Sequence, residues 1–105
     1  MTGLGVVASC GMGADAFWDG LLTAPPSGPR RIDDFDPGPW FTTKEARRID
    51  RFAQFAVAAA AMALDDAGPV GADPDRSGVI IGSGVGGLET LEQQIVICHT
   101  KGPDR

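Results

Sequence analysis

Apolar and polar residues along this chain follow a helical spacing in three stretches. In the first, from Ala14, one face carries Phe17, Trp18, Leu21 and Leu22. In the second, within residues 42–67, the apolar face is built largely from small residues: Ile49, Ala53, Ala56, Val57, Ala60 and Leu64. The third follows residue 87 and carries Leu88, Leu91, Ile95 and Cys98 on one side. We therefore predict three helices, the alanine-rich second one packed and largely internal.

Capping residues set the expected ends of these helices. Thr42 and Glu45 have the spacing of a capping box, and Gly68-Pro69 supplies a left-handed cap and a stop after Ala67. One uninterrupted helix is therefore expected over residues 42–67. The first helix is expected to end before Pro25, residues 25–40 to form a loop rich in proline and glycine, and the third helix to end at Gly102.

Two short segments have the character of strands. Residues 2–7 are interpreted as the tail of a strand entering a glycine turn, and the β-branched run 79–81 as a buried parallel strand. A turn is expected at residues 73–75. The order strand, helix, helix, strand, helix predicts an α/β fold with a parallel sheet. Because two strands make a poor sheet, residues 1–105 are interpreted as part of one domain.

Composition narrows the classes of function. The chain has 105 residues, 43% of them hydrophobic, and a net charge of −5, which disfavours general affinity for nucleic acid or anionic membranes. Its longest apolar run, residues 55–64, is too short to span a bilayer, and the beginning does not resemble a signal peptide. With only two cysteines and no secretory signal, a cytoplasmic protein is expected.

Neither cysteine is a convincing nucleophile. Cys10 is predicted to be a partly buried structural thiol, while Cys98 and His99, as helical neighbours, point about 100° apart and are predicted to be solvated. With one histidine, the chain has too few ligands for a zinc site, and no cofactor is predicted.

Basic residues are concentrated in one place. Lys44, Arg47, Arg48 and Arg51 fall within about 60° on a helical wheel, opposite the apolar face. They are four of the nine basic residues of an acidic chain. Taken alone, such a stripe is either an ordinary solvated face or a binding surface for an acidic partner.

The glycine loop 82–87 permits two interpretations. Its spacing, Gly82-x-Gly84-x-x-Gly87 between a predicted strand and a helix, matches the dinucleotide fingerprint and indicates a nucleotide-binding module on local grounds. It lacks the second strand with a terminal acidic residue that the fingerprint requires, and no phosphate-binding lysine follows. Glycines needed only for close packing are the alternative.

Three segments in order carry a family resemblance: residues 2–7, 44–52 and 78–87. Together they resemble the start of a β-ketoacyl-acyl carrier protein synthase of the elongating, synthase II type, close to the type II polyketide ketosynthases. The resemblance implies the N-terminal portion of a thiolase-like fold, a mixed sheet with packed helices, here incomplete. It also implies a parent enzyme that works as a homodimer or as a heterodimer of ketosynthase and chain-length factor.

The resemblance assigns roles to two parts of the chain. Lys44, Arg47 and Arg48 correspond to the surface that receives acyl carrier protein, and Val85 to the residue that gates the far end of the acyl pocket. In the family the loop 82–87 supports the pocket floor and the dimer interface. Cys10 does not correspond to the catalytic cysteine.

The implied reaction is decarboxylative Claisen condensation of an enzyme-bound acyl group with malonyl-carrier protein in fatty acid or polyketide synthesis. Departures from the family are a first strand that begins at Met1, a short segment before Lys44, and an end at Arg105. This end precedes the family's nucleophilic cysteine, two histidines and lysine. We expect the chain alone to be inactive and marginally stable or associated. A truncated gene product, the nucleotide-binding module and a non-catalytic carrier-binding module remain alternatives.

Overall fold

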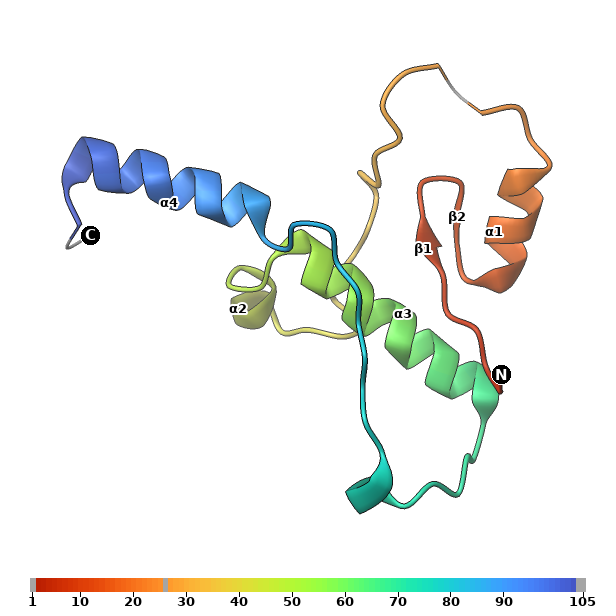
Figure 1. Cartoon of the computed structure of the whole chain (residues 1–105). Coiled ribbons are helices and arrows are strands. Elements are labelled where there is room, and N and C mark those ends of the chain that lie inside the picture. The colour runs from red at the N-terminus through yellow and green to blue at the C-terminus, as the bar shows by residue number, and fades with distance from the viewer. Residues whose placement is uncertain (1, 26, 104–105) are drawn as a thin grey trace.

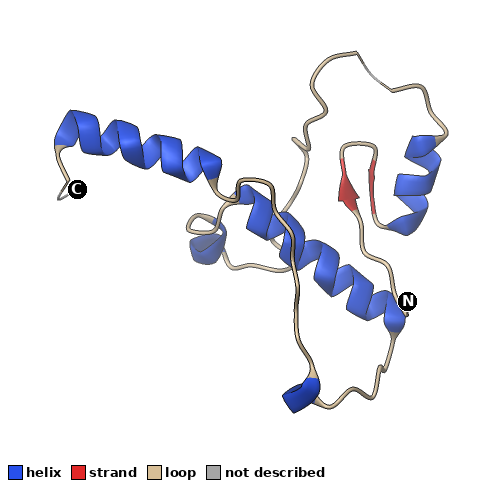
Figure 2. Ribbon diagram, viewed as in Figure 1, coloured by secondary structure: helices blue, strands red, loops and turns tan. Residues whose placement is uncertain are grey.

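A computed structural model of the chain describes residues 2–25 and 27–103 (Figures 1 and 2). Met1, which the sequence places in a first strand, lies outside the described residues. The elements in chain order are strands β1 (Val7–Ala8) and β2 (Gly11–Met12), helices α1 (Ala14–Leu21), α2 (Thr43–Ala46) and α3 (Arg51–Ala67), the 3₁₀ turn η1 (Pro74–Arg76) and helix α4 (Leu88–Lys101). The architecture thus mixes helices with a little sheet.

The only sheet among the described residues is a hairpin near the N-terminus. β1 and β2 pair antiparallel, with Val7 opposite Met12 and Ala8 opposite Gly11. The predicted strand over residues 2–7 is therefore wrong except at Val7. Residues 2–6 instead run in an extended conformation beside α3, held by a 2.8 Å hydrogen bond from the Leu4 amide to the Asp66 carboxylate.

Glycine permits this close approach to α3. A Cβ at Gly3 would collide with the carbonyl oxygen of Ala63, and one at Gly5 with that of Ala59. The alanines of α3 and these two glycines therefore bring two backbones together without side chains between them. The prediction that neighbours can approach the alanine-rich helix closely is confirmed.

The face of α3 that is buried differs from the predicted apolar face. Ala58 is fully buried and Gln54 is 6% exposed, whereas Val57 and Leu64, which belong to the predicted face, are 43% and 65% exposed. The helix ends at Ala67 as predicted. Gly68 follows with φ of 65°, but its ψ of −156° lies outside the left-handed helical region. Within the predicted face, Ala53 and Ala56 are half-buried, and Ala60 is exposed like Val57 and Leu64. The prediction of a largely internal helix is therefore wrong, because no described segment covers this part of α3.

A small aromatic cluster forms the core between α3 and the loop before α2. Phe35, 5% exposed, stacks on Trp40 with ring centroids 5.7 Å apart and meets Phe55 edge-on at 5.0 Å. The guanidinium of Arg51 lies 5.0 Å from the centre of the Phe35 ring and 5.2 Å from that of Phe55. The described part of the predicted loop, residues 27–40, is therefore irregular, as predicted, and is anchored at its end by these contacts.

The predicted strand at residues 79–81 does not form. Val79 is 82% exposed and Ile80 fully exposed, in an extended segment that crosses to α4 without a partner (Figure 1). A strand is stabilised by hydrogen bonds to a neighbouring strand, and the described residues offer none here. The parallel sheet predicted from the sequence is consequently absent from the described chain, while the predicted turn at residues 73–75 overlaps η1.

The molecule is open rather than closed around one core. Its accessible surface of 8550 Å² exceeds the roughly 5,600 Å² that a compact monomer of 10.9 kDa exposes. The radius of gyration of 17.1 Å likewise exceeds the ~13 Å of a compact domain of this length. In Figure 1, α4 projects away from the rest, and its apolar residues Leu88, Leu91 and Ile95 are more than half exposed.

The aromatic cluster gives a direct test of this fold. Replacing Phe35 with Ala removes the one ring that contacts Trp40, Phe55 and Arg51, so we expect a loss of about 3 kcal/mol or more in unfolding free energy. Urea unfolding followed by Trp40 fluorescence measures it. Leu22→Ala, at a residue 73% exposed, is the control and should change stability by less than about 0.5 kcal/mol. Equal effects of the two variants would contradict the assigned core.

Candidate functional site

The candidate site begins at α2, whose N-terminus is closed by side chains. Thr42 Oγ1 accepts a hydrogen bond from the Glu45 amide at 3.3 Å, and Glu45 Oε2 accepts one from the Thr42 amide at 2.9 Å and another from Thr42 Oγ1 at 2.6 Å. The predicted capping box is confirmed. These bonds lower the pKa of Glu45 from its ordinary 4.5, the hydroxyl of Thr42 more than its amide. The same hydrogen bonds fix the first turn of α2, which carries Lys44.

The predicted single helix over residues 42–67 is broken. α2 ends at Ala46, the chain turns through residues 47–50, and α3 begins at Arg51. The break is bridged by Gln54, whose Nε2 donates to the carbonyls of Ala46 at 2.7 Å and Ile49 at 2.8 Å. A side-chain amide thereby replaces backbone hydrogen bonds that a continuous helix would make.

The break changes the predicted basic stripe. Lys44, Arg47 and Arg48 are exposed, the first on α2 and the others at its C-terminal end. Arg51 points instead toward the core, where its guanidinium donates to the carbonyls of Phe35 at 3.3 Å and Ile32 at 3.1 Å. A helical wheel assumes one axis, so it could not separate Arg51 from the others. We call Lys44, Arg47 and Arg48 the basic segment.

A pocket of about 320 Å³ lies beside the basic segment. It is lined by Asp36, Pro37, Gly38, Phe41, Thr43, Ala46, Arg47, Arg51 and Gln54. Sequence reasoning missed Gln54, although it is the one strongly polar residue in the run from Phe52 to Leu64. A single side-chain amide inside an apolar run was the signal in the sequence that could have pointed to Gln54.

The glycine loop 82–87 leads into α4. Ser83 Oγ accepts a hydrogen bond from the Gly86 amide at 2.9 Å, and Val85 is 72% exposed. A Cβ at Gly87 would collide with the Asp50 carboxylate, which also accepts a hydrogen bond from Thr90 Oγ1, whereas Gly82 and Gly84 face open space. Close packing thus explains Gly87 alone. The dinucleotide fingerprint also lacks its preceding strand.

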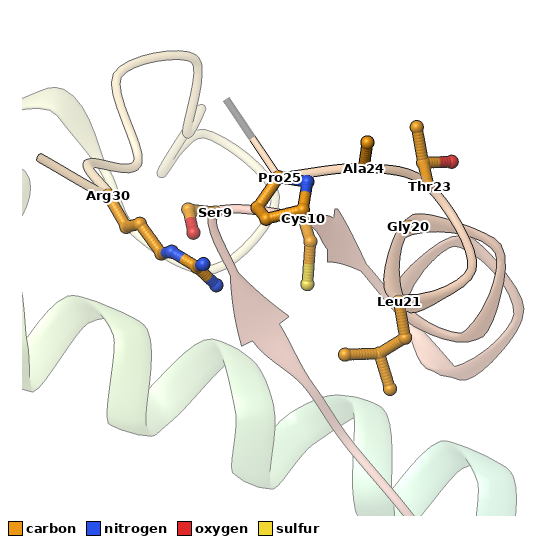
Figure 3. A pocket seen from close by; sticks show the side chains of 8 residues that line it. All are labelled: Ser9, Cys10, Gly20, Leu21, Thr23, Ala24, Pro25 and Arg30. Carbon is orange, nitrogen blue, oxygen red and sulfur yellow. The ribbon is translucent and has the colours of Figure 1, made fainter. Parts of the chain in front are cut away.

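Cys10 lies in a second pocket, of about 360 Å³, between the hairpin turn, α1 and the loop after it (Figure 3). The labelled side chains of Leu21 and Arg30 border the pocket on either side of the thiol. Cys10 is partly buried, as predicted, and Cys98 and His99 are exposed on α4, as predicted. Within residues 2–25 and 27–103, no three His, Cys, Asp or Glu side chains gather where a metal ion could be held.

Comparison with known proteins shows the family. The profile of the beta-ketoacyl synthase N-terminal domain matches residues 26–102. The chain is 37% identical to 3-oxoacyl-[acyl-carrier-protein] synthase 2 of Synechocystis, over all of this chain and 29% of the relative. It is 39% identical to the granaticin polyketide putative beta-ketoacyl synthase 1 of Streptomyces violaceoruber, over 97% of this chain and 28% of that protein. The chain belongs to the β-ketoacyl synthase family.

The extent of these matches is informative. The chain spans less than a third of the length of the curated relatives. The alignment with the Synechocystis protein runs over 122 positions although the chain has 105 residues, so that relative carries residues inside the matched region that this chain lacks. Family membership does not favour the nucleotide-binding interpretation of the loop 82–87. None of the described helices is both long and apolar enough to cross a membrane.

The capping box makes a pH-dependent contribution to α2. Because the pKa of Glu45 is lowered in the folded chain, its bonds with Thr42 stabilise α2 above pH 4.5 and are lost as the pH falls through the folded-state pKa. We expect Thr42→Ala to raise the pKa of Glu45 toward 4.5, as measured by NMR titration of its carboxyl carbon. Thr43→Ala, next to the cap, is the control and should leave that pKa unchanged. An unaltered titration in Thr42→Ala would contradict the assignment.

Proposed function

We propose that this chain forms the N-terminal portion of a β-ketoacyl-acyl carrier protein synthase with a thiolase-like fold. The parent enzyme elongates acyl chains by decarboxylative Claisen condensation with malonyl-carrier protein in fatty acid or polyketide synthesis. The names of relatives in both pathways support this, since they include 3-oxoacyl-[acyl-carrier-protein] synthase 2 proteins and polyketide synthases of Streptomyces. The open surface of the chain is consistent with a larger enzyme that covers α4 and the segment 79–81.

The role of this chain in that enzyme is to receive the acyl carrier protein. The observation that carries this proposal is the exposed basic segment on a chain with net charge −5. Lys44, Arg47 and Arg48 lie within five consecutive residues at the end of a capped helix. Positive charge gathered there attracts an acidic partner, speeds encounter and fixes orientation more than it adds affinity.

Val85 is proposed to take part in the acyl pocket, at the far end from the carrier. Its exposure of 72% leaves the side chain available to a surface from the rest of the enzyme. In the same way the loop 82–87 and α4 are proposed to face a second subunit, in a homodimer or in a heterodimer with a chain-length factor. These roles rest on the family and on the position of Val85 before α4.

Charge reversal tests the docking proposal. Arg47→Glu with Arg48→Glu places two negative charges where the acidic carrier protein would approach, so binding should weaken on the order of tenfold or more. Isothermal titration calorimetry with phosphopantetheinylated acyl carrier protein measures it. Wild-type affinity should also fall as salt rises from 0.05 to 0.5 M, since exposed charges are screened.

The matched control uses another pair of exposed adjacent arginines. Arg30→Glu with Arg31→Glu makes the same charge change in the loop before the aromatic cluster. Its carrier affinity should stay close to that of the wild type. If both pairs weaken binding equally, net charge rather than the basic segment governs the association, and the docking proposal fails.

The chain alone is proposed to lack the condensing activity. The 105 residues contain one histidine, while the family reaction employs two together with a cysteine and a lysine. Incubation of the purified chain with acyl-carrier protein and malonyl-carrier protein should yield no β-ketoacyl product by mass spectrometry. Product formation above that of a reaction without the chain would contradict this.

A further inference from the structure

The turn that carries Arg47 and Arg48 is held at both ends by one side chain. Nε2 of Gln54 donates to the carbonyl of Ala46, just before the two arginines, at 2.7 Å, and to that of Ile49, just after them, at 2.8 Å. Gln54 itself is 6% exposed and lies one turn into α3. We call these two hydrogen bonds of Gln54 the clamp. The clamp joins both ends of the turn that carries Arg47 and Arg48 to the buried face of α3.

The two hydrogen bonds lie where the chain departs from a continuous helix. In a continuous helix, the carbonyls of Ala46 and Ile49 would accept from backbone amides four residues on, and Arg51 would share a face with Arg47. In the structure α2 ends at Ala46, the chain turns through residues 47–50, and Arg51 lies against the rings of Phe35 and Phe55. The helix break thus separates one structural arginine from two exposed ones.

The side-chain amide of Gln54 is oriented by the hydrogen bonds that its Nε2 donates, while its oxygen, Oε1, accepts none among the described residues. Oε1 is also buried. Gln54 and Arg47 both line the pocket of about 320 Å³ beside the basic segment. A buried acceptor without a partner destabilises the fold. Two short bonds from Nε2 to carbonyls are the interaction that an apolar residue of similar size could not supply.

We propose that Gln54 is a positioning residue for carrier-protein docking, a role that rests on the proposed function. It acts through Arg47 and Arg48 by fixing the turn between Ala46 and Ile49, and makes no contact with the carrier itself. Preorganised charges bind with less loss of conformational freedom than charges on a mobile turn. Without the clamp, the two arginines sample many directions and the carrier protein binds more weakly.

A double-mutant cycle tests the proposal on the 105-residue chain, with phosphopantetheinylated acyl carrier protein as the probe. Gln54→Met keeps the length of the side chain and removes the donor. It should weaken carrier binding about fivefold in the wild-type background and have no further effect when Arg47→Ala and Arg48→Ala are already present. In the Lys44→Ala background, the full fivefold loss should remain.

Two further variants separate positioning from stability. Ala60→Gly weakens α3 at an exposed site away from the break and should leave carrier affinity unchanged. Gln54→Asn keeps the amide but is one methylene too short to reach both carbonyls. It should give the same pattern with a smaller loss, and it serves as the test if Gln54→Met does not fold.

The outcomes distinguish the two proposals. Equal loss on Gln54→Met with and without the arginines, or no loss at all, overturns the positioning role while wild-type binding through the basic segment still stands. An equal loss on Ala60→Gly overturns it as well, because stability would then explain the effect. If the wild-type chain does not bind the carrier protein, or binds it independently of Arg47 and Arg48, the proposed function fails and the positioning role falls with it.

Discussion

The contact on which the described structure most depends is that of the Arg51 guanidinium with two aromatic rings that also contact each other. The guanidinium lies over Phe35 and Phe55 and donates to two carbonyls of the loop that precedes α2. A cation in this position joins an irregular segment to the first turn of α3 by both its charge and its flat apolar surface. Without it, the contact of Phe35 with Phe55 would be the main link from the loop over residues 27–40 to α3, since Phe35 and Ala58 are the buried hydrophobic residues of the described chain.

The same first turn of α3 organises the basic segment. Arg51 faces the loop, and Gln54, three residues on, faces the end of α2. Arg51 satisfies two carbonyls of the irregular loop, and Gln54 satisfies the carbonyl of the last residue of α2 and that of Ile49 in the turn after it. Carbonyl groups at a helix end or in an irregular connection need such partners when they are buried. The exposed charges of Arg47 and Arg48 are thus supported by a pair of polar side chains directed inward. The proposed docking surface and a core contact are thus built from one stretch of sequence.

How far the sequence predicts this structure depends on how local each signal is. The capping box at Thr42 and Glu45, the end of α3 at Ala67, the end of α4 before Gly102 and the turn near Pro74 rest on neighbouring residues, and the structure has them. The first helix likewise ends before Pro25. A strand at residues 79–81 requires a partner strand. Its β-branched residues favour strand structure, but the described residues contain no strand that pairs with them. The helix break was missed because capping and periodicity both permitted a continuous helix. The break depends on the tertiary position of Gln54, which neither capping nor periodicity reports.

The basic segment illustrates why a family resemblance and a physical reading are needed together. A helical wheel gathered four cations, and the resemblance selected three of them, Lys44, Arg47 and Arg48, for a carrier-docking role. The structure turns the fourth, Arg51, into the core for a reason that neither the wheel nor the resemblance contains, namely two carbonyl acceptors and two rings. Arg51 keeps its charge, but its half-buried guanidinium is directed to these carbonyls and rings rather than to the surface. In the proposed function, electrostatic attraction of the carrier protein would therefore come chiefly from the short basic segment. Its strength would depend on how firmly the turn that carries Arg47 and Arg48 is held.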